Sequence, residues 1–446
     1  MRVTPITDQG GKFSPTVRYV VMRSKTVPIP VRWSFLLFVL TIPFESMDVG
    51  FTSDSVSLAK LSGFLFFGCY LLFYSPLFGK RPFPRPHPIL WWFLGHLAIY
   101  LMSTLFIDPQ FTWFALVHVV TFLQLIVLLW ITTDLLKDQK MRESVLLAYS
   151  MSVVYLALGI IFGLPGVEVQ TGATGRISAA GAHVNGLAGT MSLAMLILIA
   201  LRVKKVFKHF FSRILLPVLT LPILLVIVKT ASRMGILAVL IGSLVYLLPS
   251  WRSKRAVTAI ILVTCAIGTL LYLIVTDRLM MERWQQAQGG DLSMRQLAIP
   301  AALGMISERP IFGWHPVEFA CEIGARIGIR QCLDAHNLLF NMLAEVGVVG
   351  TIPFFAGLWL YFRAAWMARR GDLGLMPLAL LLAMLTLHMA GPLVFWKPFW
   401  LFMGLTLAAA STAAMKQARY GLVFLVRTLM NRGVLRGYPE IWISKK

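Results

Sequence analysis

The sequence predicts an all-α, polytopic membrane protein with about 12 transmembrane helices and one large segment outside the membrane. Three observations support this fold class. Of the 446 residues, 58% are hydrophobic and only 13% are charged. The apolar residues gather in stretches of roughly 20, the length that crosses about 30 Å of hydrocarbon as a helix. Basic residues fall in short clusters between these stretches. This composition excludes an ordinary soluble domain.

Apolar stretches suited to a membrane helix recur along the whole chain. They lie near residues 33–47, 58–78, 88–107, 111–133, 143–163, 182–201, 212–229, 233–250, 255–276, 337–362, 375–394 and 398–415. The division that follows is a cytoplasmic amino-terminal arm at 1–32, helices one to nine within 33–276, an outer helical segment at 277–336, helices ten to twelve within 337–415, and a basic cytoplasmic tail at 416–446.

The basic residues alternate between the two sides of the predicted membrane. With the amino terminus in the cytoplasm, the inner segments carry 30 of the 41 Lys and Arg residues. This distribution follows the positive-inside rule, so both termini are expected in the cytoplasm. Topology therefore accounts for most of the net charge of +22, and the sequence predicts no nucleic-acid partner.

The remaining 11 basic residues lie on the outer side, mostly in or beside 172–190, 229–235 and 277–335. Such an arginine is often a solvated loop charge or one that snorkels to lipid headgroups, a role that suits Arg309, Arg326 and Arg330. Three others lie at the edges of spans or of the outer segment: Arg176, Arg233 and Arg295. Because a guanidinium matches phosphate oxygens in geometry, we expect these three to bind an anionic lipid headgroup such as a pyrophosphate.

The stretch CLDAHNLLFNMLAEVGVVG, residues 332–350, begins polar and becomes a predicted membrane helix. Asp334 is expected to cap this helix. Three polar residues follow at intervals of four and share one helix face: Asn337, Asn341 and Glu345. Inside a membrane, such a face looks into protein or into a wet cavity. Gly347 and Gly350 are expected to permit close helix packing.

His336 lies where the outer segment meets this helix. A lone histidine is usually a satisfied packing residue, but an imidazole is also a base near neutral pH. Its place at a membrane edge, beside a polar helix face and near outer arginines, favours a catalytic base. His183 and His315 are the next candidates.

The outer segment is expected to form two or three short helices on the membrane face, one of them near residues 294–305. Cys321 and Cys332 lie in this segment. In an oxidising compartment they form either a disulfide, which would pin the segment beside His336, or two free thiols. The sequence leaves both states open.

The stretch AHNLLFNMLAEVGVVG resembles the His-Asn…Glu-x-Gly…Gly block of the O-antigen ligase and O-antigen polymerase membrane family. The upstream order is similar as well. Gly175-Arg176 followed by Asn185 looks like the family's first arginine region, and Ser232-Arg233 looks like its SR-G turn. Arg295, followed by PIFGWHP, is similar to its arginine and glycine-turn region, although Trp314 replaces the usual small residue. The resemblance covers roughly residues 172–360.

This resemblance implies a GT-C-like glycosyltransferase in the bacterial inner membrane, with its active site facing the periplasm. Such an enzyme moves a glycan from a polyprenyl (undecaprenyl) diphosphate carrier to an acceptor hydroxyl, on lipid A–core or on another glycan. His336 would be the base, and Arg176, Arg233 and Arg295 would bind the pyrophosphate. Four residues would support them: Asn185, Asn337, Asn341 and Glu345. Direct displacement would invert the anomeric carbon. No cofactor is implied, and the lack of an Asp-x-Asp pair favours arginine over metal at the pyrophosphate.

Other functions remain open at this point. A ligase is slightly favoured over an O-antigen or exopolysaccharide polymerase, which needs the same donor site and base. A bicarbonate-type secondary transporter fits the span count. However, it predicts internal repeats and polar residues at mid-membrane, whereas here they gather at the outer edge. A passive scaffold explains the spans but not the clustered arginines and histidine.

Overall fold

The computed structural model describes residues 27–45, 47, 57–75, 84–172, 175–203, 215, 218–247, 261, 264–265, 267–269, 271–272, 275–290, 294–329, 332–391 and 393–431. Most of these residues are helical. The helices before the outer segment are α1 (Ile29–Thr41), α2 (Leu58–Phe73), α3 (Pro88–Ser103), α4 (Thr112–Leu135), α5 (Gln139–Phe162), α6 (Val184–Val203), α8 (Thr220–Lys229) and α9 (Arg233–Leu247). Those that follow are α11 (Arg278–Gln288), α12 (Arg295–Glu308), α13 (Pro316–Arg326), α14 (Leu338–Ala368), α15 (Met376–His388) and α16 (Lys397–Asn431).

Many of the helices are apolar enough for a membrane. Among the described residues, six are long enough to cross it: those within Pro88–Phe106, Pro109–Leu135, Gln139–Phe162, Val184–Leu201, Leu338–Ala368 and Lys397–Ala418. Five shorter apolar helices coincide with other predicted spans: Ile29–Phe44, Leu58–Phe73, Thr220–Lys229, Arg233–Tyr246 and Met376–His388. The span expected at 255–276 lies largely outside the described residues. The chain is therefore a multi-pass, all-α membrane protein, and the total of twelve spans stays a prediction.

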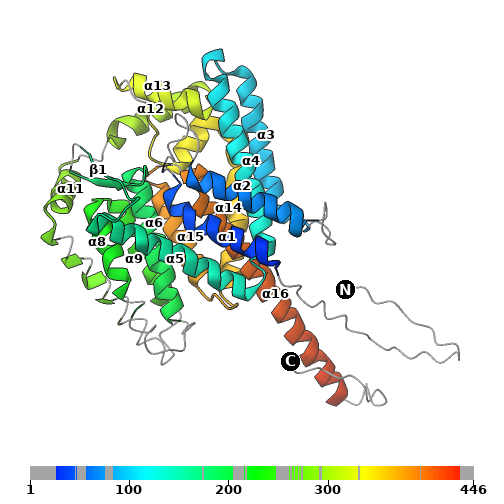
Figure 1. Ribbon diagram of the computed structural model, residues 1–446. Helices are drawn as coiled ribbons and strands as arrows, with labels where there is room; N and C mark the ends of the chain where they lie inside the picture. Colours follow the sequence, from blue (N-terminus) through cyan, green and yellow to red (C-terminus); the bar gives the residue numbers. More distant parts are fainter. Residues whose placement is uncertain are drawn as a thin grey trace.

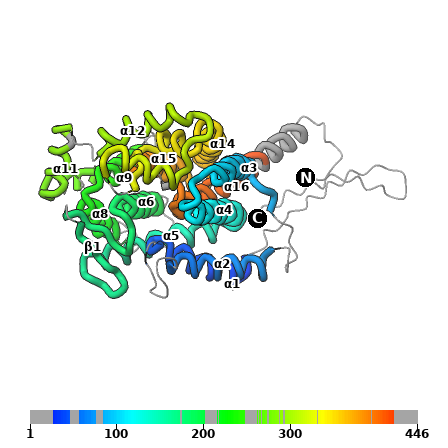
Figure 2. Tube along the Cα trace, turned by 90° about the horizontal axis from the view of Figure 1, so that it is seen from above, coloured from blue at the N-terminus to red at the C-terminus, as the bar shows by residue number. Residues whose placement is uncertain are grey.

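Burial separates central helices from peripheral ones. About 83% of the apolar window of α6 and 78% of that of α16 are buried, against 39% for α3 and α4. Figure 2 shows the same order, with α16 among the other helices and α1 and α2 along one edge. In a membrane protein the exposed apolar faces of α3 and α4 are those that contact lipid tails.

The described residues of the outer segment form three helices, α11, α12 and α13, in agreement with the expectation of two or three short ones. In Figure 1, α12 and α13 lie over one end of α3, α4 and α14, and the last turns of α16 point away at the opposite end. We call the end with α11–α13 the upper end. A small antiparallel hairpin, β1 (Val169–Thr171) and β2 (Ile177–Ala179), joins α5 to α6 and was not expected from the sequence.

Helix α14 is interrupted at Gly347, whose φ of 62° and ψ of −171° are not helical. At the break, the helix exchanges hydrogen bonds with the turn at residues 310–315. The amides of Val348 and Val349 donate to Pro310 (2.9 Å) and Ile311 (3.2 Å). In return, the carbonyls of the residues four positions earlier, Ala344 and Glu345, accept from Trp314 (2.7 Å) and His315 (2.8 Å). All four peptide groups freed by the break are thus paired.

Two sequence-based expectations for this region need correction. Asn337, not Asp334, caps α14, because its Oδ1 accepts from the amides of Leu339 and Phe340. Gly347 admits the 310–315 turn rather than another helix, whereas Gly350 does face Ile99 of α3. Helix α16 continues past residue 415 to Asn431, so the first part of the expected tail at 416–446 is helical.

Candidate active site

Four connections at the upper end bring the predicted site residues together. Arg176 lies in the β1–β2 turn, and Asn185 in the first turn of α6. Arg233 opens α9 after the short turn from α8, and His336 precedes α14. Arg295 opens α12. These residues come from parts of the chain that are far apart in sequence.

Asn185 joins the arginine side of the site to the loop after α15. Its Oδ1 accepts from Arg176 Nη2 (3.4 Å) and from Ser232 Oγ (3.1 Å). Its Nδ2 donates to the carbonyl of Ala390 (3.5 Å). The close approach of α9 to α6 needs a glycine, because a Cβ at Gly235 would lie 2.8 Å from Cβ of Ala188. The SR-G turn therefore places Ser232 beside Asn185.

Arg176 is held by the protein and still carries unfavourable charge. Its Nε donates to the carbonyl of Thr230 (3.0 Å). Burial, followed by the positive charges of Arg283 and Arg233, lowers the pKa of Arg176 to about 10. Arg233 in turn donates to the carbonyl of Arg283 (3.3 Å). A group of like charges this close gains stability when an anion binds.

Arg295 extends this group toward His336. Burial lowers the pKa of Arg295, the Asp334 carboxylate opposes that change, and Arg283 adds to it. The Nε atom of Arg295 is buried and has no hydrogen-bond partner among the described residues. Arg176, Arg233, Arg283 and Arg295 thus form one positive cluster.

His336 lies beside this cluster and is partly buried, with 26% of its side chain exposed. Its Nδ1 is 2.7 Å from Asp334 Oδ1. That contact lacks hydrogen-bond alignment, although the distance is that of an ion pair. His183 joins the same neighbourhood: burial lowers its pKa, and the charges of Arg176 and His336 lower it further while Asp334 raises it.

The backbone around the site is strained. Five non-glycine residues in the described part of the chain have a positive φ: Ala180, Ala231, Met294, His315 and His336. His336 itself has a φ of 51°, and Ala231 and Met294 lie within two residues of Arg233 and Arg295. Such conformations cost about 1–3 kcal/mol each and cluster at functional sites.

The expected polar face of α14 supports the loop that carries His336. Asn341 is fully buried; its Oδ1 accepts from the amide of Ala335 (3.0 Å), and its Nδ2 donates to Glu345 Oε1 (3.4 Å). Asn337 is used in capping. These three residues therefore contact backbone and one another rather than the arginine cluster.

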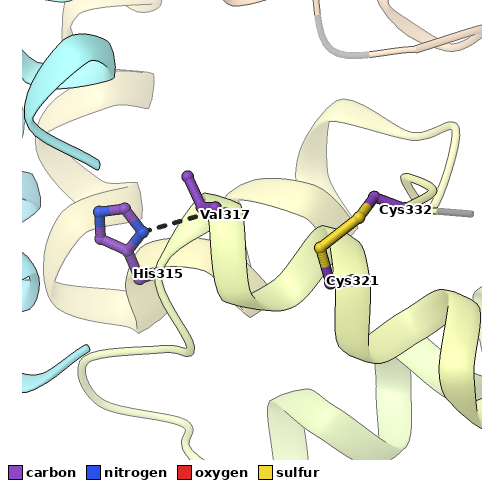
Figure 3. Close-up of a disulfide and its surroundings, with 4 residues drawn as sticks. All are labelled: His315, Val317, Cys321 and Cys332. Carbon is purple, nitrogen blue, oxygen red and sulfur yellow. Dashed lines mark hydrogen bonds between the residues drawn. A yellow bond between two sulfur atoms is a disulfide. The ribbon is translucent and has the colours of Figure 1, made fainter. Parts of the chain in front are cut away.

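A disulfide between Cys321 and Cys332 settles the question that the sequence left open. Figure 3 shows it joining α13 to Cys332, which lies four residues before His336 in the chain. The amide of Leu333 also donates to the carbonyl of Ala320 (2.7 Å). The segment at residues 332–335 is therefore fixed just before the site.

Two of the other outer arginines, Arg309 and Arg326, lie against a tryptophan ring. The guanidiniums of Arg309 and Arg326 lie 3.9 and 5.2 Å from the ring centre of Trp314. Arg326 also pairs with Glu308 (2.7 Å). Trp314 thus packs under cations at the surface. Arg330 lies outside the described residues.

Two residues of the site, Arg283 and Asp334, were not predicted from the sequence. Arg283 was counted among the outer cations but was not selected as a site residue. Its helix α11 approaches the site because Leu279, one turn before Arg283, packs on Gly175. A Cβ at Gly175 would lie 3.2 Å from Leu279 Cδ1. Asp334 was taken as a cap, although the Asp-x-His spacing itself signals a carboxylate within reach of the imidazole.

No group of three or more His, Cys, Asp or Glu side chains in the described ranges is placed to hold a metal ion. The site's chemistry is that of clustered guanidiniums, one carboxylate and an imidazole. Such a set binds phosphate oxygens and can accept a proton.

Comparison with known proteins finds a similarity in the segment that holds most of this site. Residues 218–355 fit the family model described as O-antigen ligase. That range holds Arg233, Arg283, Arg295 and His336, whereas Arg176 and Asn185 precede it. No curated protein matches the chain. The match supports the resemblance seen in the sequence: residues 218–355 of this chain are similar to the O-antigen ligase family.

Proposed function

We propose that this protein is an O-antigen ligase-like glycosyltransferase. It moves a glycan from an undecaprenyl diphosphate carrier to an acceptor hydroxyl. The observation that carries the proposal is the convergence of Arg176, Arg233 and Arg295 beside His336 at one end of an apolar helix bundle. A donor with a membrane-embedded tail and a diphosphate head fits that arrangement, because it presents its anion at the end of the bundle.

The roles follow from the charge that changes in the reaction. As the bond from the anomeric carbon to the diphosphate breaks, negative charge grows on the leaving oxygen, and the arginine cluster stabilises it. Arg283 adds a fourth positive charge to this cluster. His336 accepts the proton of the acceptor hydroxyl. Direct attack on the anomeric carbon inverts its configuration, and the arginines take the place that a metal ion has in other transferases.

The proposed acceptor is lipid A–core or a similar terminal acceptor. The His-Asn block and the Gly-Arg region support the ligase function over a polymerase, which would extend the glycan on the next lipid-linked repeat unit. The two functions share the donor site and the base. They differ in the product, so the experiment below separates them.

The proposed location is the bacterial inner membrane, with the site in the periplasm. The excess of Lys and Arg on the opposite segments supports this orientation. A disulfide close to the site supports an oxidising compartment. We propose that residues 1–32 and 416–446 lie on the cytoplasmic side and 277–336 in the periplasm.

The test compares surface glycans of a deletion strain complemented with wild type, with His336→Ala and with the surface variant Arg278→Ala. Arg278 is 91% exposed and pairs locally with Glu282 (2.8 Å). A ligase predicts that polymerised glycan stays on the carrier in the deletion strain and with His336→Ala, and reaches its acceptor with wild type and Arg278→Ala. Single repeat units in the deletion strain would identify a polymerase. Unchanged glycans would refute the glycosyltransferase.

A further inference from the structure

Asp334 makes two contacts with the same residue. Its Oδ1 accepts from the backbone amide of His336 at 2.5 Å and lies 2.7 Å from the imidazole Nδ1. The first contact holds the backbone of His336, which has a φ of 51°. The second has the distance of an ion pair without hydrogen-bond alignment, so an imidazolium formed at His336 would lie against the carboxylate.

Titratable groups from three parts of the chain lie near the Asp334 carboxylate. The charge of Asp334 acts to raise the pKa of Arg295 on α12 and of His183 before α6. Glu345 on α14 is the acidic residue that lies near Asp334. The loop after α15 closes over the pair, because a Cβ at Gly391 would lie 3.7 Å from Asp334 Oδ2 and 3.9 Å from His336 Nδ1. Carboxylate and imidazole are therefore partly buried side by side against that loop.

We propose that Asp334 is the positioning residue of the catalytic base: it fixes the tautomer and the aim of His336 and balances the imidazolium that forms. The inference rests on the proposed function. In the step, the acceptor oxygen bonds to the anomeric carbon, and the electron pair of the breaking bond leaves with the diphosphate. The hydroxyl proton moves to Nε2 of His336, while the Nδ1 proton stays against Asp334.

A purely local role for Asp334 predicts a different outcome. Asp108 makes the same type of turn contact two residues ahead, its Oδ1 accepting from the amide of Gln110 (3.2 Å), but it lies in the α3–α4 connection. Asparagine can replace either aspartate as an acceptor for that amide. It cannot supply the negative charge. The pair Asp334→Asn and Asp108→Asn therefore separates turn geometry from charge.

The experiment measures transfer by the full-length protein in proteoliposomes with a lipid diphosphate-linked glycan donor, for wild type, Asp334→Asn, Asp334→Glu, Asp108→Asn and His336→Ala. We expect kcat of Asp334→Asn to fall by roughly 10²-fold or more, with the KM for the donor changed by less than about threefold. Asp334→Glu should recover part of kcat, and Asp108→Asn should match wild type. Thermal unfolding of each variant reports on folding.

The outcomes are distinguishable. If wild type transfers glycan and His336→Ala does not, but Asp334→Asn keeps full kcat, the positioning role is wrong and the proposed function stands. The positioning role is also wrong if Asp334→Asn loses kcat only in proportion to unfolding, or if it raises the donor KM instead. If wild type transfers nothing, the proposed function itself fails.

Discussion

The backbones of Gly313 and Gly347 are in direct contact, although 33 residues of chain lie between them. A Cβ at Gly313 would lie 2.5 Å from the carbonyl carbon of Glu345 and 2.6 Å from the amide nitrogen of Gly347. A Cβ at Gly347 would overlap the carbonyl of Ile311. Both residues have a positive φ. The Gly of the turn and the Gly of the Glu-x-Gly block are thus two halves of one junction.

Replacing either glycine should therefore destabilise the fold. For Gly313→Ala and Gly347→Ala we expect a loss of at least about 2 kcal/mol, from the left-handed backbone together with backbone overlap. Thermal unfolding in detergent and the yield of monodisperse protein measure this loss. Gly304→Ala on α12 is the matched control, because no atom lies within 4 Å of its Cβ position. Equal stability of all three variants would contradict the junction.

Arginine substitutions should act on the donor. Arg176→Ala and Arg295→Ala should each lower kcat/KM for the lipid diphosphate donor by roughly tenfold or more, and Arg176→Lys should not restore it, because an ammonium lacks the paired donors of a guanidinium. Initial rates at varied donor concentration measure the effect, with Arg278→Ala as the control. Donor kinetics equal to wild type in both alanine variants would contradict the proposed binding of the diphosphate by these arginines.

Acid should weaken the protein partly through His315. Its Nδ1 accepts from the amide of Val317 (3.3 Å), and burial, aided by His118, lowers its pKa to about 4. Because the unfolded residue titrates near 6.5, the unfolded state binds the extra proton first, so stability is complete above pH 6.5 and falls toward pH 4. The expected loss at pH 5 is about 2 kcal/mol.

The comparison variant is His315→Asn, which keeps an acceptor for that amide and tolerates the φ of 68°. Thermal unfolding at pH 8 and pH 5 should show a smaller acid loss for it than for wild type. Identical losses would mean that His315 does not titrate in this window.

The disulfide should matter for both stability and activity. The double variant Cys321→Ser, Cys332→Ser removes a crosslink that closes a short loop, so we expect unfolding to be easier by about 3 kcal/mol. Transfer should also fall, because the segment before His336 is then no longer crosslinked to α13. Treating wild type with a thiol reductant should reproduce both effects. Cys69→Ser, at a free cysteine on α2, should change neither.

Chelators should leave transfer intact, since arginines do the work of charge stabilisation in the proposed reaction. The measurement is the initial rate before and after EDTA, then with Mg²⁺ added back. Inhibition that Mg²⁺ reverses would reveal a metal requirement and overturn the metal-free mechanism.

Sequence patterns predicted those parts of the molecule that depend on local properties. Hydropathy located eleven of the apolar helices, and helical spacing located α12. Arg176, Arg233 and Arg295 were predicted because they lie in segments expected on the outer side. The positive-inside rule does not explain basic residues there. His336 was selected by its position at the start of a membrane helix.

The remaining features depend on contacts between distant segments. The hairpin at β1–β2 has strands of three residues, too short for an alternating pattern. Arg283 joins the cluster only because α11 packs on Gly175. The break in α14 depends on the turn at 310–315. Within residues 338–368 the sequence pattern that indicates a break is a glycine in a helix.

The exchange of hydrogen bonds at Gly347 also constrains the order of assembly. The turn at 310–315 is synthesised before α14, so it is available when that helix enters the membrane. Without the turn, the broken helix would leave four peptide groups open in an apolar medium, at several kcal/mol each. Helix α14 can take its final shape only after the segment before it has folded. The segment that carries His336 is fixed in position in the same folding step.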